Sequence, residues 1–265
     1  MEKIRIAVIG GGNMGGAITS AISKNEEYEV FLYERTTEKA KKLLKECPIN
    51  LISSISEASD MDCVIIALKP QNLPYFYEEL SLLSPRLFIS ICAGVDLDTL
   101  KTNLKTSSVI RFMPNIGAKV KKSVTAVATS EDVEEDLVNL SMDIARSFGD
   151  AFLLDESLFS AFIGISGSAI AFVFDFMHNL AMAGVREGIP YDKALSIVSG
   201  TMESAAMLQK STGKGAIELE TMVCSPRGTT IEGVKALTDG GFASIIQDAV
   251  DATVRKSEEM TRNAK

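Results

Sequence analysis

The chain has 265 residues, enough for one large domain or two smaller ones, and its composition is that of a soluble globular protein. A net charge of −8 without any Lys/Arg block argues against a nucleic-acid-binding or anionic-membrane-binding surface. The four cysteines lie far apart and His178 is the single histidine, so we expect no metal site and reduced thiols in a cytoplasmic protein.

A glycine-rich turn follows the first predicted strand, residues 4–9, so no signal peptide is expected before it. Gly10, Gly12 and Gly15 form a G-x-G-x-x-G pattern, and apolar residues then recur at helical spacing. Between a strand and a helix this pattern indicates dinucleotide binding, because Gly12 lets the backbone approach a pyrophosphate and the helix N-terminus stabilises an anion. The alternative is a merely tight strand–helix turn.

The end of the second predicted strand, residues 29–34, gives conflicting signals about the cofactor. Glu34 lies about 20 residues past the glycines, where an acidic residue binds the ribose 2′-hydroxyl and favours NAD. Arg35, Thr36 and Lys39 follow at once and would instead bind a 2′-phosphate and favour NADP. A third interpretation of Arg35 and Lys39 is a solvated helix start.

The chain up to residue 156 alternates between strands and helices. The further strands are predicted at residues 51–52, 62–68, 87–91, 108–113, 124–128 and 151–154. The helices are predicted at residues 37–47, 73–83, 96–104 and 133–148, with Asp96 and Ser130 as N-cap candidates. This alternation predicts an α/β domain with a doubly wound parallel sheet. Ligands of such sheets bind beyond the carboxyl ends of the strands, so residues 10–14, 67–70, 92–94 and 113–115 are expected to line one cleft.

From residue 157 the chain becomes helical throughout. Helices are predicted at residues 159–183, 191–208, 217–222, 231–238 and 242–256. The most apolar stretch, residues 161–176, contains two glycines and two serines and is expected to be a buried helix start, too short and too polar to span a bilayer. The apolar faces exceed what one small bundle can hide, which predicts an obligate dimer with interleaved helices.

A second candidate site lies at residues 223–233, VCSPRGTTIEG. Ser225 is expected to cap a helix whose first residue is Pro226. Gly228, Thr229 and Thr230 would add free N–H groups and two hydroxyls, which suits a carboxylate with an adjacent hydroxyl donor. The alternative is simply a well-capped helix. No Ser/His/Asp or Cys/His arrangement is legible, and His178 is expected to be a packed or interface residue.

These segments resemble the pyrroline-5-carboxylate reductase family over nearly the whole chain. The matching stretches are IGGGNMGGAI at residues 9–18, ALKPQ at 67–71, ISICAGV at 89–95, RFMPN at 111–115, ISGSAIAFVF at 165–174, LAMAGVREGIP at 180–190 and SPRGTTIEGVKAL at 225–237, followed by GGF. The resemblance implies a Rossmann-like domain over residues 1–156 and a helical substrate and dimerisation domain over 157–265. It also implies reduction of a cyclic imine to proline, the last step of proline biosynthesis, with NADPH or NADH.

The resemblance also implies roles for individual residues. It places the cofactor pyrophosphate at Ile9, Gly10, Gly11, Gly12, Asn13, Met14 and Gly15. It places the adenosine ribose or its phosphate near Arg35, Thr36 and Ser54. It places the nicotinamide half near Ala67, Leu68, Lys69, Pro70, Ile91, Cys92, Ala93 and Asn115. It places the substrate at Ser225, Gly228, Thr229 and Thr230. The Thr230 hydroxyl would form a hydrogen bond with the imine nitrogen and so act as the catalytic residue.

Several positions depart from the family pattern. Ile116 and Gly117 replace Thr-Pro, and Arg227 occupies a glycine position. Further departures are Ala169, Ile170, Phe172 and Met182. Two alternatives therefore stand beside the reductase: a paralogue acting on a related imine or keto acid, and a non-catalytic, NAD(P)-binding regulatory dimer.

Overall fold

A computed structural model describes residues 2–263, and the chain forms two compact units. The first unit comprises the residues up to Ser168 together with those from Thr253 onward, and the second comprises Ala169–Ala252. The last helix, α11 (Phe242–Asn263), therefore contributes residues to both units. The predicted domain boundary after residue 156 stays a prediction.

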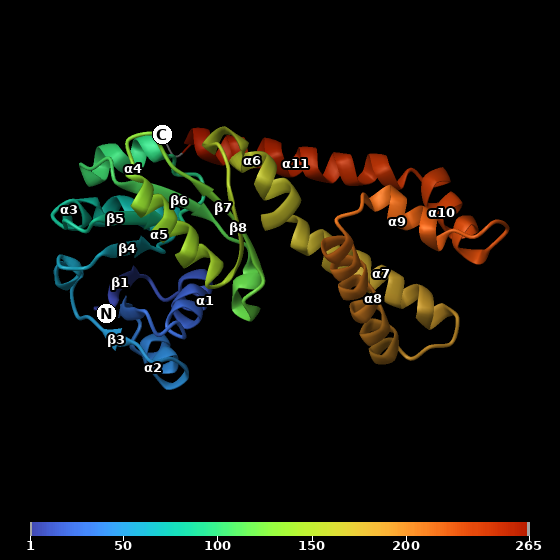
Figure 1. The fold of residues 1–265 in the computed structure, drawn as a ribbon, viewed down its shortest axis with the longest axis horizontal. Helices are drawn as coiled ribbons and strands as arrows, with labels where there is room; N and C mark the ends of the chain where they lie inside the picture. The colour runs from blue at the N-terminus through green and yellow to red at the C-terminus, as the bar shows by residue number, and fades with distance from the viewer. Residues whose placement is uncertain (1, 264–265) are drawn as a thin grey trace. The chain divides into compact units, whose positions relative to one another are not determined.

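The first unit is built on one eight-stranded sheet (Figure 1). Its strands are β1 (Ile4–Ile9), β2 (Tyr28–Tyr33), β3 (Asn50–Leu51), β4 (Cys63–Ile66), β5 (Leu87–Ser90), β6 (Val109–Met113), β7 (Ser123–Ala128) and β8 (Gly149–Leu153). They follow the order β3-β2-β1-β4-β5-β6-β7-β8. The strands β1 to β6 pair in parallel in the order of a doubly wound dinucleotide-binding domain, which confirms the predicted fold class. The order of the strands reverses between β1 and β4.

The last two strands depart from the parallel arrangement. β7 pairs with β6 in antiparallel orientation, and β8 pairs in parallel with β7. The connection between β6 and β7 holds only the short 3₁₀ helix η3 (Ile116–Val120). A parallel crossover needs about a dozen residues or more, so this connection reverses the chain instead. The predicted parallel arrangement therefore holds for β1 to β6, whereas β7 and β8 run in the opposite direction.

Two hydrophobic cores cover the two faces of the sheet. The helices α1 (Asn13–Ile22), α2 (Thr37–Glu46) and α5 (Glu135–Arg146) pack on one face. The other face carries η1 (Ile55–Ala58), η2 (Pro70–Phe76), α3 (Tyr77–Leu80), α4 (Leu97–Leu104) and α6 (Phe159–Phe162). In β1, Ile6 and Val8 enter the first core and Ala7 and Ile9 the second, all with 0% exposure. Burial on both faces explains why the parallel strands are continuous apolar runs.

Three local expectations had different outcomes. The Asp96 carboxylate accepts the Thr99 N–H at 2.9 Å, so Asp96 caps α4 as predicted. Ser130 does not cap α5, because that helix begins at Glu135 after Glu134. The α-helix predicted at residues 73–83 is mostly the 3₁₀ helix η2, with only α3 in α-helical form. Pro74 explains the difference, since proline cannot donate the backbone hydrogen bond that an α-helix requires there.

The second unit is helical throughout its described length. It contains α7 (Ala169–Arg186), α8 (Tyr191–Thr212), α9 (Ala216–Val223), α10 (Thr229–Asp239) and the first part of α11. The helices α7 and α8 pack through the buried residues Ala181, Ala194 and Val198. Small side chains at this contact let the helix backbones approach closely. Large apolar side chains remain exposed on this unit, among them Phe174 at 59% and Ile217 at 74%.

The most apolar helical run is Glu156–Arg186, which includes the π-helix η5 (Ile163–Gly167). By length and composition alone it is sufficient to cross a membrane, a property that the core helices of soluble proteins share. The run has 31 residues, longer than the expected apolar stretch, and 22% of its most apolar window is buried. The expectation of a buried helix start is therefore not met within a single chain.

Candidate functional site

The glycine turn between β1 and α1 is shaped by close backbone contacts. Gly10 has a φ of +113°, and a Cβ there would lie 2.6 Å from the Ala67 carbonyl oxygen. A Cβ at Gly15 would overlap the Gly10 carbonyl oxygen. At Gly12, by contrast, no other atom of residues 2–263 would lie within 4 Å of a Cβ. Gly10 and Gly15 therefore allow the backbone of the turn to pack closely against its neighbours, and Gly12 leaves space for a ligand.

The N-terminus of α1 adds an anion-binding character to this turn. Gly12 is the N-cap in an extended conformation, and no described side chain caps the helix. The first N–H groups therefore remain free to bind an anion. An adjoining cavity of about 450 Å³ is lined by this turn, one face of α1, Glu46 and the lysines Lys24, Lys39, Lys42, Lys119 and Lys121. In a chain of net charge −8, this positive lining suits a pyrophosphate, so the residues fit a dinucleotide.

A fixed carboxylate lies beside the turn at the end of β2. One oxygen of Glu34 accepts the Gly11 N–H at 2.7 Å, and the other accepts the Thr36 N–H at 2.8 Å. Burial would raise the pKa of the Glu34 carboxyl, but the hydrogen bonds from Thr36 and Gly11 and the charge of Lys39 outweigh it and lower the pKa. Arg35 places its guanidinium over the Phe76 ring, 5.3 Å from the centroid.

The ends of β4 and β5 meet the glycine turn where the strand order reverses. Ala67 donates its N–H to the Ile9 carbonyl at 2.9 Å, and Ile91 donates to the Ile66 carbonyl at 3.0 Å. The Cys92 thiol donates to the Leu68 carbonyl at 3.3 Å. Burial raises the pKa of this thiol, so it stays protonated at neutral pH. The structure thus brings together three of the predicted strand ends.

Other predicted cofactor residues are engaged within the protein itself. Asn115 is 7% exposed; its side-chain oxygen accepts the Gly117 N–H at 3.0 Å and its amide nitrogen donates to the Ser166 hydroxyl at 3.2 Å. Ser54 is the N-cap of η1 and forms a capping box with Glu57. Lys69 and Pro70 begin η2, with Lys69 exposed. Cofactor contacts by these residues stay predictions.

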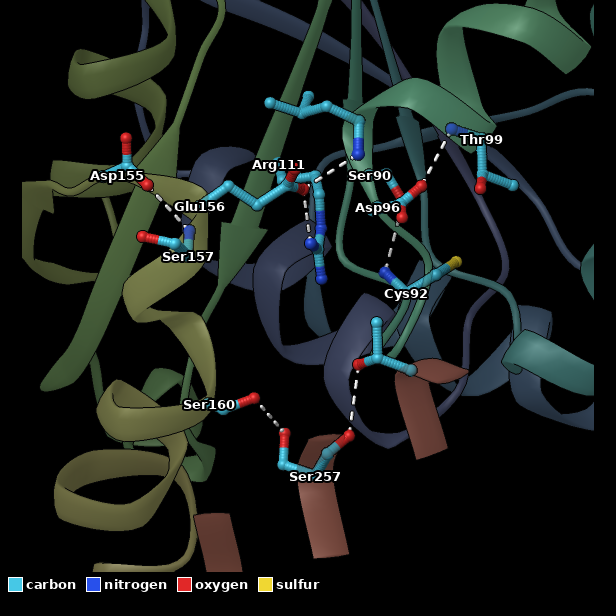
Figure 2. Close-up of polar contacts among 12 residues, drawn as sticks. Ser90, Cys92, Asp96, Thr99, Arg111, Asp155, Glu156, Ser157, Ser160 and Ser257 are labelled. Carbon is cyan, nitrogen blue, oxygen red and sulfur yellow. Dashed lines mark hydrogen bonds and ion pairs between the residues drawn. The ribbon is translucent and has the colours of Figure 1, made fainter. Parts of the chain in front are cut away.

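A buried ion pair was missed by the sequence analysis. Arg111 on β6 is 4% exposed and pairs with Glu156 (Figure 2). Its guanidinium also lies 4.8 Å from the Phe159 ring centroid. The same Glu156 oxygen accepts the Leu97 N–H at 2.8 Å, at the start of α4. An arginine within the apolar run VIRFM signals a buried charge that needs a partner. The partner lies 45 residues further along the chain, too far to be assigned without coordinates.

The last helix joins this region within the first unit. Ser160 on α6 and Ser257 on α11 place their hydroxyl oxygens 3.1 Å apart (Figure 2). A Cβ at Gly94, just past β5, would lie 3.7 Å from the Met260 carbonyl oxygen. The predicted end of α11 at residue 256 is therefore too early, because these contacts hold a helix that continues to Asn263.

The second candidate site, in the second unit, begins differently from its prediction. The helix α10 starts at Thr229 with Gly228 as its N-cap, so Ser225 is not the cap and Pro226 is not the first helical residue. Residues 225–228 instead form a turn in which Gly228 donates its N–H to the Ser225 carbonyl at 2.9 Å. A Cβ at Gly228 would overlap the Ser225 hydroxyl oxygen and lie 3.0 Å from the Ser225 carbonyl oxygen, so a larger residue there would require Ser225 to move.

The new helix start keeps the predicted chemistry. No described side chain caps α10, so its first N–H groups remain free to bind an anion. Thr229 and Thr230 occupy the first turn and add two hydroxyls. Arg227 has a φ of +59°, a conformation that glycine adopts readily and that costs arginine about 1 kcal/mol. The departure from glycine therefore leaves the turn in place at an energetic cost.

His178 does not join either site. It is exposed, and its Nδ1 atom lies 3.0 Å from the Tyr191 hydroxyl oxygen in the second unit. Within residues 2–263 no group of three or more His, Cys, Asp or Glu side chains is arranged to hold a metal ion.

The fold and the glycine turn define a class of protein, the dinucleotide-binding proteins with a Rossmann-like domain. A family model described as "NADP oxidoreductase coenzyme F420-dependent" matches residues 5–94, and one described as "Pyrroline-5-carboxylate reductase dimerisation" matches residues 156–260. Pyrroline-5-carboxylate reductases of Aquifex aeolicus and Escherichia coli are 31% and 33% identical, covering 97% and 99% of this chain and 97% and 100% of their own. The chain belongs to the pyrroline-5-carboxylate reductase family.

Solved structures agree with this assignment. The pyrroline-5-carboxylate reductase of Coxiella burnetii superposes with a TM-score of 0.90 at 27% identity, covering 97% of this chain and 98% of its own. The Plasmodium falciparum pyrroline carboxylate reductase, solved with NADP bound, superposes with a TM-score of 0.84 at 25% identity, covering 98% and 99%. The predicted family and fold class are confirmed, and the dimerisation match supports homo-oligomerisation.

Proposed function

We propose that this protein reduces the C=N bond of 1-pyrroline-5-carboxylate to L-proline, the last step of proline biosynthesis, with NAD(P)H. Relatives that carry this activity in their names span nearly the full length of the chain. The observation that carries the proposal within the structure is the uncapped start of α10, where Thr229 and Thr230, directly after the N-cap Gly228, offer N–H groups and hydroxyls for a small carboxylate.

The roles of the residues follow from their chemistry. The free N–H groups at the start of α1 bind the pyrophosphate, and Gly12 leaves the space that it needs. When bound, NAD(P)H supplies a hydride to the imine carbon. The first turn of α10 binds the substrate carboxylate, and the Thr230 hydroxyl donates a hydrogen bond to the nitrogen, which gains electron density as the carbon is reduced. The protonated imine already carries the proton that the product amine keeps, so no further acid is needed.

The quaternary structure follows from the exposed apolar surface. Phe174, Ile197 and Ile246 are 59%, 51% and 41% exposed in the isolated chain. An apolar surface of this kind marks an association site, and the dimerisation match covers all three residues. We therefore propose a homo-oligomer assembled through the C-terminal helices. We further propose that it acts in the cytoplasm on a small-molecule substrate, without a nucleic-acid or membrane partner.

The test is an activity assay with a panel of cyclic imines and keto acids, each with NADH and NADPH. Pyrroline-5-carboxylate is expected to be the best substrate. Preference for another imine or keto acid would instead support a paralogous reductase, and cofactor binding without turnover would support a regulatory dimer.

A threonine variant tests the assigned role within that assay. Thr230→Ala is expected to lower kcat/KM by about tenfold or more, the scale of one lost transition-state hydrogen bond. Thr238→Ala is the matched control, because the Thr238 hydroxyl donates a hydrogen bond to the Val234 carbonyl of the same helix. Equal kinetics for the two variants would refute the role of Thr230.

A further inference from the structure

The carboxylate of Glu34 occupies the place where the two nicotinamide cofactors differ. In dinucleotide-binding domains the end of the second strand lies against the adenosine ribose, which carries a hydroxyl in NADH and a phosphate in NADPH at its 2′ position. Glu34 follows β2 directly, and its two oxygens accept the N–H groups of Gly11 and Thr36 at 2.7 and 2.8 Å. Both oxygens of the carboxylate are thus held in place by backbone N–H groups.

These two hydrogen bonds occupy two of the backbone donors that would otherwise be available to a 2′-phosphate. Thr36 is the N-cap of α2, and a helix start of this kind is a common phosphate-binding position. Its N–H is already paired with the chain's own anion. A phosphate brought to this place would meet a carboxylate held ionised by its hydrogen bonds, and like charges at close range repel. A ribose hydroxyl could instead donate a hydrogen bond to this carboxylate, because each carboxylate oxygen can accept more than one hydrogen bond.

The nearby cations do not reverse this balance. The Arg35 guanidinium stacks on Phe76, which makes a flat surface suited to the adenine ring. Lys39 is exposed and contributes to the low pKa of the Glu34 carboxyl, so part of its charge is already balanced. The remaining lysines line the cavity beside α1, where they attract the pyrophosphate of either cofactor equally.

We propose that Glu34 is the specificity-determining residue of this enzyme and selects NADH over NADPH by accepting a hydrogen bond from the ribose 2′-hydroxyl. The proposal rests on the proposed function for its cofactor class. It assigns Arg35 to the adenine ring rather than to a 2′-phosphate.

Direct binding of the two cofactors tests the proposal without any turnover. Dissociation constants for NADH and NADPH are measured by quenching of cofactor or protein fluorescence, or by calorimetry, on the full-length protein. The wild type is expected to bind NADH at least about tenfold more tightly, a difference of about 1.4 kcal/mol. Glu34→Gln keeps the shape and removes the charge, and it is expected to reduce that ratio at least about tenfold, chiefly by tighter NADPH binding.

Two further variants make the test specific. Glu38→Gln, in the exposed first turn of α2, removes a charge nearby and is expected to leave the ratio unchanged. Arg35→Ala is expected to weaken both cofactors alike, whereas loss of NADPH affinity alone would identify Arg35 as a phosphate ligand and overturn the proposal. Tighter binding of NADPH by the wild type, or an unchanged ratio in a folded Glu34→Gln variant, would also overturn it.

The outcomes also separate this proposal from the proposed function. A protein that prefers NADPH yet reduces pyrroline-5-carboxylate refutes the role of Glu34 and leaves the function standing. A protein that prefers NADH and reduces no cyclic imine refutes the function and leaves the role of Glu34 standing.

Discussion

Replacing Glu156 by glutamine tests the buried ion pair that joins β6, α4 and the start of α6. The side chain of Arg111 is 5% exposed and that of Glu156 is 27% exposed. Glutamine keeps an acceptor for the Leu97 N–H, so the main change is that the Arg111 guanidinium loses its counter-charge inside the protein. Removing one partner of a buried pair costs about 3–5 kcal/mol, and the partial exposure of Glu156 places the expected loss near the lower end, about 3 kcal/mol.

Thermal unfolding measures this loss. For a unit of this size, each kcal/mol lowers the Tm by about 2–4 °C, so Glu156→Gln is expected to lower it by about 6–12 °C. Asp136→Asn is the matched control, because it breaks an ion pair with Arg86 in which both side chains are more than half exposed. Such a pair contributes less than about 1 kcal/mol. If Glu156→Gln lowers the Tm no more than Asp136→Asn, the Arg111–Glu156 pair does not stabilise the fold as argued.

Further predictions concern the glycine turn, the assembly and the response to acid. Gly12→Ala is expected to weaken cofactor binding about tenfold or more with an unchanged Tm, because the added Cβ would occupy space left for the cofactor and would contact no described protein atom. Gly15→Ala is expected to cost about 1–3 kcal/mol of stability by overpacking. A lower Tm for Gly12→Ala than for Gly15→Ala would contradict the structural role of Gly15 and the ligand-binding role of Gly12. Phe174→Glu is expected to break the oligomer in light scattering, whereas Leu82→Glu leaves it intact, because Leu82 is even more exposed (76% against 59%) but lies in the first unit; an intact Phe174→Glu oligomer would exclude that surface. Because its folded pKa is lowered, Glu34 contributes stability above the ordinary carboxyl pKa of 4.5 and loses it as the pH falls through the lowered value. Glu34→Gln should therefore lose less stability than the wild type on acidification below that pH, and identical pH profiles would show that its hydrogen bonds do not matter.

Most strands of the first unit can be predicted from the sequence because they are buried on both faces. The stretch from Ile6 to Ile9 is apolar throughout, which distinguishes it from a surface strand, and Gly10 and Gly15 that follow fix the turn by close backbone contact. The predicted doubly wound, parallel arrangement, which β1 to β6 adopt, follows from these patterns. Asp96 is likewise a local signal, since a cap acts on an N–H only three residues away.

The features that the sequence did not predict depend on distance along the chain or on competition between local signals. The direction of β7 depends on the short connection at η3 and not on the residues of β7 themselves. The pairing of Arg111 with Glu156 joins two elements far apart in sequence. Ser225 and Ser130 both look like helix caps, yet the backbone turns before each helix begins, so neither acts as one. An apolar composition also fails to predict burial in α7, where Phe174 stays 59% exposed in the isolated chain.

The central claim is tested most directly by incubating the purified protein with pyrroline-5-carboxylate and NADH and measuring both products. We predict that L-proline accumulates in a one-to-one ratio with oxidised cofactor. Oxidation that does not depend on the imine, or the absence of L-proline from a protein that binds the cofactor, would contradict the claim.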